Sequence, residues 1–240
     1  MAWGRQIFGI PIRINASWLL VVALVTWSLS HGYFPATSPG LPAVMYWAMG
    51  FGCALLLFVC VLLHELGHSL VAKRFGIPVP CVTLFLFGGV AQIGRDPQRP
   101  SAEFAIALAG PLVSVLIAIG CFAAARLITI HAPGHVGVVA IARYLAMINT
   151  ALICFNLLPG FPLDGGRLVR ATLWAWTGSR RTATRVASLM GTALGLGLFV
   201  LGVWTLAQGA WVGGVWYMVL GLFLRNTALT SYRAATARSV

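Results

Sequence analysis

The sequence predicts an all-α polytopic membrane protein with about six transmembrane helices and a small β-hairpin or sheet insertion after the second helix. Composition is the first observation: of 240 residues, 60% are hydrophobic and only 8% are charged, and the mean hydropathy is +0.92. No soluble globular domain needs such a composition. The second observation is that the apolar residues form long runs with short polar connections. We therefore expect residues 1–240 to form a single membrane domain.

The basic residues are interpreted as topology signals facing an anionic leaflet. The net charge is +12, but the bases are scattered in ones and twos between apolar runs, so no nucleic-acid partner is expected. Of sixteen Lys and Arg residues, only Arg126 and Arg143 fall near the predicted external side. The rest lie on the opposite side, and the positive-inside rule then predicts that both termini are cytoplasmic.

The first span is predicted in the apolar run from Ala16 to Leu29, which follows a basic start. The run is short for a span, and flanking apolar residues bring it near the required length. A cleaved signal peptide is the alternative, since Ser28 and Ser30 fit a small-residue cleavage site. The segment from His31 to Pro42 holds three prolines and no Lys, Arg, Asp or Glu, which predicts a loop or a shallow re-entrant segment.

The second span is predicted from Ala43 to Ala72 and ends at the basic pair Lys73-Arg74. The pattern then changes, because Ile77 to Ile93 is rich in β-branched and aromatic residues and is interrupted by Gly88-Gly89. These features predict two short strands around a turn. Arg95 to Pro100 is interpreted as a polar exposed loop.

The remaining elements continue the same alternation of apolar runs and short connections. Three further spans are predicted at Ser101–Ile130, Val136–Leu157 and Val186–Leu206, a short helix at Leu168–Trp176, and a last span at Trp211–Leu224. The residues from Leu158 to Arg167 form a Pro- and Gly-broken segment that stays apolar up to Asp164. Irregular backbone of this kind must be buried in protein or line a cavity.

The second span contains the motif His64-Glu65-Leu66-Gly67-His68. On a helix, His64 and His68 lie one turn apart on the same face, where two imidazoles can ligate one Zn²⁺. Glu65 can then reach a metal-bound water as a general base. The alternative is a set of buried helix residues paired with one another without a metal. Ionisable groups inside a membrane helix are costly and mark a functional site by default.

A third protein ligand is sought among the acidic residues. The chain has four of them: Glu65, Asp96, Glu103 and Asp164. Solvated pairing with nearby arginines and the helix dipole explain Asp96 and Glu103. Asp164 sits in the apolar Pro/Gly segment, on the same predicted side as the two histidines, and would complete a site that leaves one position for water. Pairing of Asp164 with Arg167 is the alternative.

These motifs together resemble the site-2 protease family of intramembrane zinc metalloproteases. The resemblance rests on the histidine motif within a span and on the run from Asn156 to Arg167, with Gly88-Gly89 and Ala109-Gly110-Pro111 as further landmarks. Gly9 to Arg13 is similar to the prokaryotic branch whose members often carry CBS domains. No separate CBS or PDZ domain is expected in this chain.

The resemblance implies that His64, His68 and Asp164 bind one Zn²⁺ per chain, that Glu65 activates the water, and that Asn156 steadies the substrate or the oxyanion. It implies a transmembrane protein substrate, such as a membrane-tethered anti-sigma or transcription factor, cleaved within the lipid bilayer of a prokaryotic cell membrane. The strands before Ile93 are expected to hold the substrate in extended form. A six-span metal carrier and a catalytically inactive scaffold are the alternatives.

Overall fold

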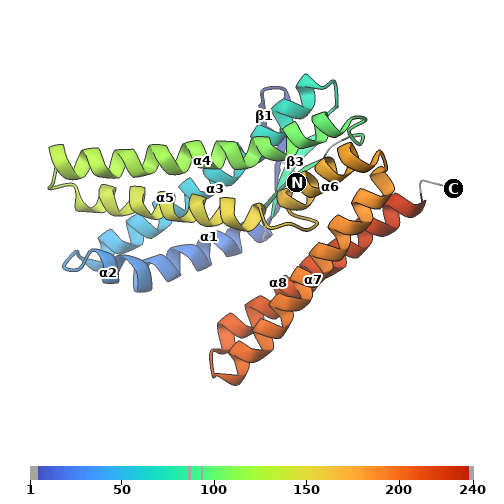
Figure 1. Ribbon diagram of the computed structural model, residues 1–240. Helices are drawn as coiled ribbons and strands as arrows, with labels where there is room; N and C mark the ends of the chain where they lie inside the picture. The colour runs from blue at the N-terminus through green and yellow to red at the C-terminus, as the bar shows by residue number, and fades with distance from the viewer. Residues whose placement is uncertain (1–4, 86–87, 93, 238–240) are drawn as a thin grey trace. The chain divides into compact units, whose positions relative to one another are not determined.

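The computed structural model describes residues 5–85, 88–92 and 94–237 (Figure 1). The chain forms two compact units. The first unit comprises Met1–Asp96 and Ala109–Ile153, and the second comprises Pro97–Leu108 and Cys154–Val240. Two helices belong to both units: α4 (Pro100–His131) starts in the second and continues in the first, and α5 (Val136–Asn156) ends in the second.

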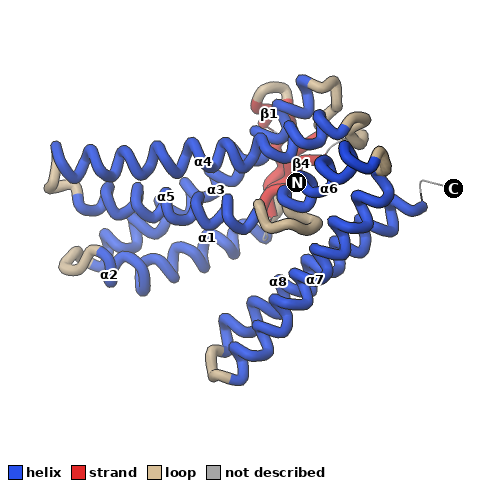
Figure 2. The backbone as a smooth tube through the Cα atoms, in the orientation of Figure 1, coloured by secondary structure: helices blue, strands red, loops and turns tan. Residues whose placement is uncertain are grey.

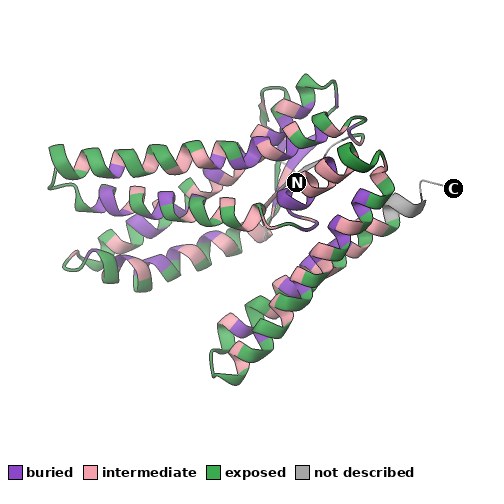
Figure 3. Ribbon diagram, in the orientation of Figure 1, coloured by how far each residue is buried: buried purple, intermediate pink, exposed green. Residues whose placement is uncertain are grey.

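Six helical segments of the described chain are long and apolar enough to cross a membrane, which confirms the predicted number. They are Ser17–Thr37, Ala43–Arg74, Pro100–His131, Val136–Asn156, Arg180–Ala207 and Trp211–Arg233. Much of their surface is exposed (Figure 3). Large apolar side chains contribute to it, such as Leu116 and Val212, which are 70% and 87% exposed. Exposed apolar side chains in this number suit hydrocarbon better than water.

The first span is longer than predicted. It comprises α1 (Ser17–Ser28), a π-helical turn η1 (Leu29–Tyr33) and α2 (Phe34–Thr37). The predicted loop from His31 to Pro42 is therefore wrong over its first half. Pro35 does not stop the helical segment: it lies at the start of α2, directly after the π-helical turn η1.

Helix α3 (Ala43–Arg74) is the central helix of the first unit, and it confirms the second predicted span. Its 32 residues reach about 48 Å, which exceeds the hydrocarbon thickness of a bilayer. One side of α3 contributes Met49 and Cys53 to a buried cluster, together with Phe34 of α2 and Tyr144 of α5. This packing fixes the helix that carries the histidine motif.

A four-stranded sheet packs near the end of α3 and has the order β1-β2-β3-β4 (Figure 2). The predicted hairpin is present as β3 (Cys81–Phe85) and β4 (Gly88–Gln92), which pair antiparallel. Gly88 and Gly89 begin β4, and the predicted strand end Ile93 lies outside the described residues. The chain start adds β1 (Arg5–Ile7) and β2 (Ile10–Ile14), of which β2 pairs parallel with β3.

Lys73 joins this N-terminal hairpin to α3. Phe8 and Gly9, with φ of +53° and +71°, form its turn, and the Lys73 Nζ donates to the Phe8 carbonyl over 2.9 Å. Strands β1 and β2 were not predicted from the sequence, although they pair antiparallel across the local turn at Phe8 and Gly9. The other partner of β2 is β3, about seventy residues further along the chain. Parallel pairing of this kind leaves no local turn signal between the two strands.

The second unit contains α6 (Asp164–Thr177), α7 (Arg180–Ala207) and α8 (Trp211–Ala237). Helices α7 and α8 run side by side as a hairpin (Figure 1). Glycines make this contact close, since a Cβ on Gly195 or Gly221 would meet the backbone of the opposite helix. Both helices extend past their predicted ends, and α8 continues to Ala237.

Candidate metal centre

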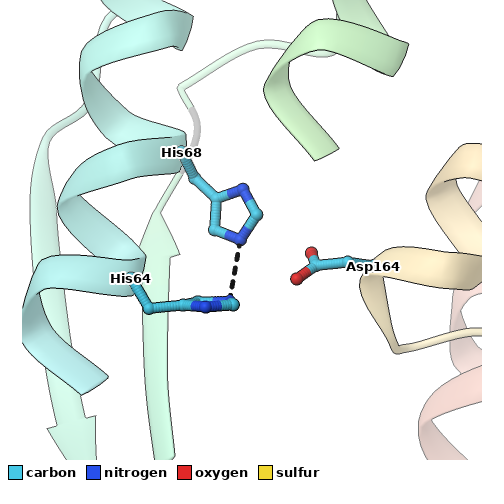
Figure 4. A group of neighbouring side chains, drawn as sticks. All are labelled: His64, His68 and Asp164. Atoms are coloured by element: carbon cyan, nitrogen blue, oxygen red, sulfur yellow. Dashed lines mark hydrogen bonds between the residues drawn. The ribbon is translucent and has the colours of Figure 1, made fainter. Parts of the chain in front are cut away.

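The two histidines of the motif lie on one face of α3 and converge at their Nε2 atoms. Each is 3% exposed, and the Nε2 atoms are 3.2 Å apart (Figure 4). Two tetrahedral Zn–N bonds of about 2.0–2.1 Å would place their nitrogens about 3.3 Å apart. The ring nitrogens of His64 and His68 therefore already have the spacing that one zinc ion requires, which is the fit expected from their i, i+4 positions.

Ser114 on α4 orients His64. Its Oγ lies 2.9 Å from the His64 Nδ1, and the side chain is fully buried. When Nδ1 carries the proton and donates to the hydroxyl, Nε2 keeps its lone pair for a metal. Ser114 was not among the site residues predicted from the sequence. It follows Gly110 by four residues, so helical periodicity from the Ala109-Gly110-Pro111 landmark places it on the same face.

Gly110 leaves the space in front of the two imidazoles open. A Cβ at this position would meet the Nε2 atoms of both His64 and His68, with the His64 atom 2.6 Å away. Gly67 brings the two helices together, because a Cβ there would lie 3.0 Å from the Ala109 carbonyl oxygen of α4. Gly67 and Gly110 thus have the same effect, which is to let α4 approach the face of α3 that carries the two histidines.

Glu65 is half-buried and lies against β4. A Cβ on Gly89 would meet the Glu65 side chain, with its Cδ 3.0 Å away. The glycine pair at the start of β4 therefore gives the carboxylate room beside the sheet. Ser69 Oγ donates to the Glu65 carbonyl over 2.8 Å, one turn further along α3. The Glu65 side chain therefore lies against the start of β4, on the same helix as His64 and His68.

Asp164 belongs to the second unit, where it is the first residue of α6 and is 8% exposed. Leu163 before it is extended, with φ −71° and ψ 160°. The predicted helix was expected to start four residues later. It starts at Asp164 because Gly165 and Gly166 carry no Cβ: a Cβ on either would meet backbone of the preceding segment, at Leu157 and Leu158 or at Gly160.

The segment that precedes Asp164 is fixed to α7. The Phe161 N–H donates to the Ala187 carbonyl over 3.1 Å, and the Phe161 side chain is buried. A Cβ on Gly191 of α7 would meet the Phe161 backbone oxygen. Gly160, Phe161 and Leu163 of the irregular Pro/Gly segment are buried in protein, as expected for such backbone, whereas Pro159 is exposed. This packing holds the start of α6, and with it the Asp164 carboxylate.

Of the five predicted site residues, His64, Glu65 and His68 lie on α3 in the first unit, and Asp164 and Asn156 lie in the second. Asn156 is the last residue of α5 and is half-buried. His64, His68 and Asp164 are all buried, and each offers one atom that can ligate a metal ion (Figure 4). Two imidazole nitrogens and one carboxylate oxygen form a donor set that suits zinc.

The environment of Glu103 differs from the predicted one. This residue was expected to be solvated near Arg99, but it is fully buried and forms an ion pair with Arg170 of α6 in the second unit. The Arg170 Nε donates to Glu103 Oε1 over 2.6 Å. Burial lowers the pKa of Arg170, and the charge of Glu103 opposes that shift. The Arg170 guanidinium also lies over the Phe161 ring, 4.7 Å from its centroid.

Comparison with protein families gives a match over most of the chain. Residues 52–131 and 126–198 match the sequence profile described as peptidase family M50. These ranges contain the histidine motif, the Ala109-Gly110-Pro111 landmark, Asn156 and Asp164.

Three similar proteins agree with this match. The chain is 40% identical over 233 residues to sll0528 of Synechocystis and 42% identical over 219 residues to Rip3 of Mycobacterium tuberculosis, both named as zinc metalloproteases. These alignments cover 97% and 91% of this chain, which spans 60% and 55% of the length of those relatives. The structure is similar to that of the site-2 protease from Methanocaldococcus jannaschii, with a TM-score of 0.63, 28% identity, and coverage of 95% of this chain and 93% of that one.

Proposed function

This chain belongs to peptidase family M50, and we propose that it is a zinc metalloendopeptidase that hydrolyses a peptide bond within or near a transmembrane segment of a membrane-anchored substrate. The observation that supports this most directly is the convergence of the His64 and His68 Nε2 atoms beside Glu65, on a helix that crosses the membrane. A plain spanning helix would be more stable with leucine at these positions.

His64, His68 and Asp164 are the proposed protein ligands of one zinc ion. A zinc ion held by such a set supplies Lewis-acid chemistry and leaves a coordination position for water. Ser114 holds the His64 ring with Nε2 directed to the metal. Gly110 keeps the space between the rings free of a side chain. These five residues from α3, α4 and α6 thus divide the task between ligation, orientation and access.

Glu65 is the proposed general base. Its carboxylate accepts a proton from the attacking water and then delivers it to the leaving amine. A metal carrier would gain little from a base beside the ligands, and an inactive scaffold would need none. Asn156 is proposed to steady the substrate carbonyl or the developing oxyanion by donating from its amide.

The proposed substrate is a transmembrane protein, such as a membrane-tethered anti-sigma or transcription factor. A helical peptide bond is shielded by its own hydrogen bonds, so the substrate must unwind before attack. The sheet order leaves β4 at an edge, where an extended peptide can pair with it. A photocrosslinker at Val90 of β4 is expected to capture a substrate segment, and failure to capture any would contradict pairing at this edge.

We further propose that residues 1–240 form a single membrane domain in a prokaryotic cell membrane, with both termini cytoplasmic. The distribution of basic residues supports this orientation. Access of a membrane-impermeant thiol reagent to cysteines placed at Thr182 and Gly134, in intact cells, tests it. Labelling at Gly134 alone is expected, and labelling at Thr182 alone would reverse the orientation.

The experiment that tests the function is cleavage of a single-span substrate by the full chain in liposomes. Cleavage should stop when a chelator removes zinc and resume when zinc is restored. Zinc flux into the same liposomes without any cleavage would favour the carrier instead. Zinc binding with neither cleavage nor flux, across several single-span substrates, would favour the scaffold.

A further inference from the structure

Arg126 on α4 and Arg143 on α5 line one groove on the surface of the first unit. The groove has a volume of about 630 Å³, and both arginines are exposed. Its floor is mostly apolar, with Ile119 and Phe122 from α4 and Met147 from α5, and it also includes Thr150. Arginine is rare inside membrane-spanning helices, so two that share one groove need an explanation.

The two arginines lie at similar depth. Arg126 precedes the end of α4 by five residues, or about 7.5 Å, and Arg143 follows the start of α5 by seven, or about 10 Å. The two helices are joined at this end by the short connection 132–135. From this depth an arginine side chain can extend its guanidinium to the headgroup region while its stem stays among apolar groups.

Among the described residues, no acidic side chain is placed within reach of the pair. Glu103 lies 23 residues before Arg126 on the same helix, about 35 Å away, and Asp96 precedes that helix. Glu65 adjoins His64, which contacts Ser114, and Ser114 lies twelve residues, about 18 Å, from Arg126. The fourth acidic residue, Asp164, follows the other end of α5 in the sequence.

A second copy of the chain cannot supply the missing charge either. Copies inserted in the same orientation place their acidic side chains at the same membrane levels, away from the arginine pair. The counterion must therefore come from outside the protein. On the predicted external side, an anionic phospholipid headgroup would supply such an anion at this depth, with an attraction of about 1 kcal/mol for each arginine near the surface.

The shape of the groove matches a lipid as well. The charged residues lie nearest the helix ends, and the apolar residues lie deeper: Ile119 is seven residues, about 10 Å, further into α4, and Met147 is about 6 Å further into α5. A phosphate at the arginines would leave an acyl chain over Phe122 and Met147. An isolated anion would use the charged end alone.

We propose that this groove binds an anionic phospholipid, with its phosphate between Arg126 and Arg143 and an acyl chain along the apolar floor. Two arginines contribute charge-assisted hydrogen bonds to phosphate oxygens, and Arg presents its donors in a planar fork that suits them. The site is separate from the metal centre.

The test is native mass spectrometry of the full chain in detergent with added dioleoylphosphatidylglycerol. We expect lipid adducts on the wild type and about thirtyfold weaker binding for the double variant Arg126→Gln/Arg143→Gln, from the loss of two such attractions. The matched control is Arg99→Gln/Arg181→Gln, which removes the same charge at exposed positions outside the groove. It should bind as the wild type does.

Three results would overturn the proposal. If both double variants lost the same amount of lipid binding, the attraction would be a general effect of charge. If the wild type bound dioleoylphosphatidylcholine as tightly as dioleoylphosphatidylglycerol, the anionic charge would not be recognised. Displacement of the lipid by millimolar inorganic phosphate would mean that a free anion is the ligand. The variant Arg126→Lys/Arg143→Lys is the control for misfolding of the glutamine variant, because it keeps the charge and should retain most of the lipid binding.

Discussion

Glu103 and Arg170 form a buried ion pair between the first turn of α4 and the middle of α6. The same guanidinium covers the ring of Phe161, three residues before the Asp164 carboxylate. Since the Phe161 N–H also donates a hydrogen bond to the Ala187 carbonyl of α7, the segment before Asp164 is held from two sides. The pair therefore supports the start of α6, where the proposed carboxylate ligand stands.

Glu103→Gln should destabilise the protein by about 3–5 kcal/mol, because Arg170 would remain buried without an ionised partner. Thermal unfolding in detergent measures this. Replacing both partners, as Glu103→Leu with Arg170→Met, should recover most of the loss, since an apolar pair needs no compensation. A single variant as stable as the wild type would show that the ion pair contributes nothing.

Gly110→Ala should abolish zinc binding, because the added methyl group would occupy the space between the His64 and His68 Nε2 atoms. Zinc content of the purified protein, measured by elemental analysis, is the readout. Gly120→Ala is the matched control on the same helix, since a Cβ there would meet nothing within 4 Å. Full zinc content in Gly110→Ala would place the metal elsewhere.

Ser114→Ala should weaken zinc binding about tenfold to a hundredfold, through loss of the partner that orients His64. Titration against a competing chelator measures the affinity. Thr129→Val removes a hydroxyl from the same helix that contacts only the Ala125 carbonyl among described residues, and it should bind zinc normally. Equal affinities for Ser114→Ala and Thr129→Val would deny Ser114 an orienting role.

Gly191→Ala should slow substrate cleavage and destabilise the protein by about 1–3 kcal/mol, because a Cβ there would push against the Phe161 carbonyl. Gly197→Ala on the same helix has open space around it and should leave both properties unchanged. Cleavage rate and unfolding are measured on the same preparations. If both variants cleave at the wild-type rate, the segment before Asp164 tolerates displacement.

Local sequence patterns were sufficient to predict the membrane spans and the histidine motif. Long apolar runs end at polar pairs such as Lys73-Arg74, and the structure ends α3 there. The i, i+4 spacing of His64 and His68 determines their shared face whatever surrounds them. The Ile77–Ile93 pattern gave the β3–β4 hairpin for the same reason, since adjacent strands need only a local turn.

Local sequence patterns could not predict contacts between residues that are far apart in the sequence. Glu103 was predicted to pair with Arg99, which lies four residues away in the sequence. Its actual partner, Arg170, lies 67 residues away on another helix. The pairing of β2 with β3 was missed because parallel strands leave no turn signal between them. The start of α6 at Asp164 was missed because two glycines resemble a loop until the backbone they contact is known.

The most direct test of the central claim compares the wild type with Glu65→Gln at matched zinc content, using a single-span substrate in liposomes. The glutamine keeps the size of the side chain but cannot accept the proton of the attacking water. Zinc binding should be retained, and cleavage should fall by about 10²–10⁴-fold. Cleavage by Glu65→Gln at the wild-type rate would contradict the role of Glu65 and the hydrolytic mechanism built on it.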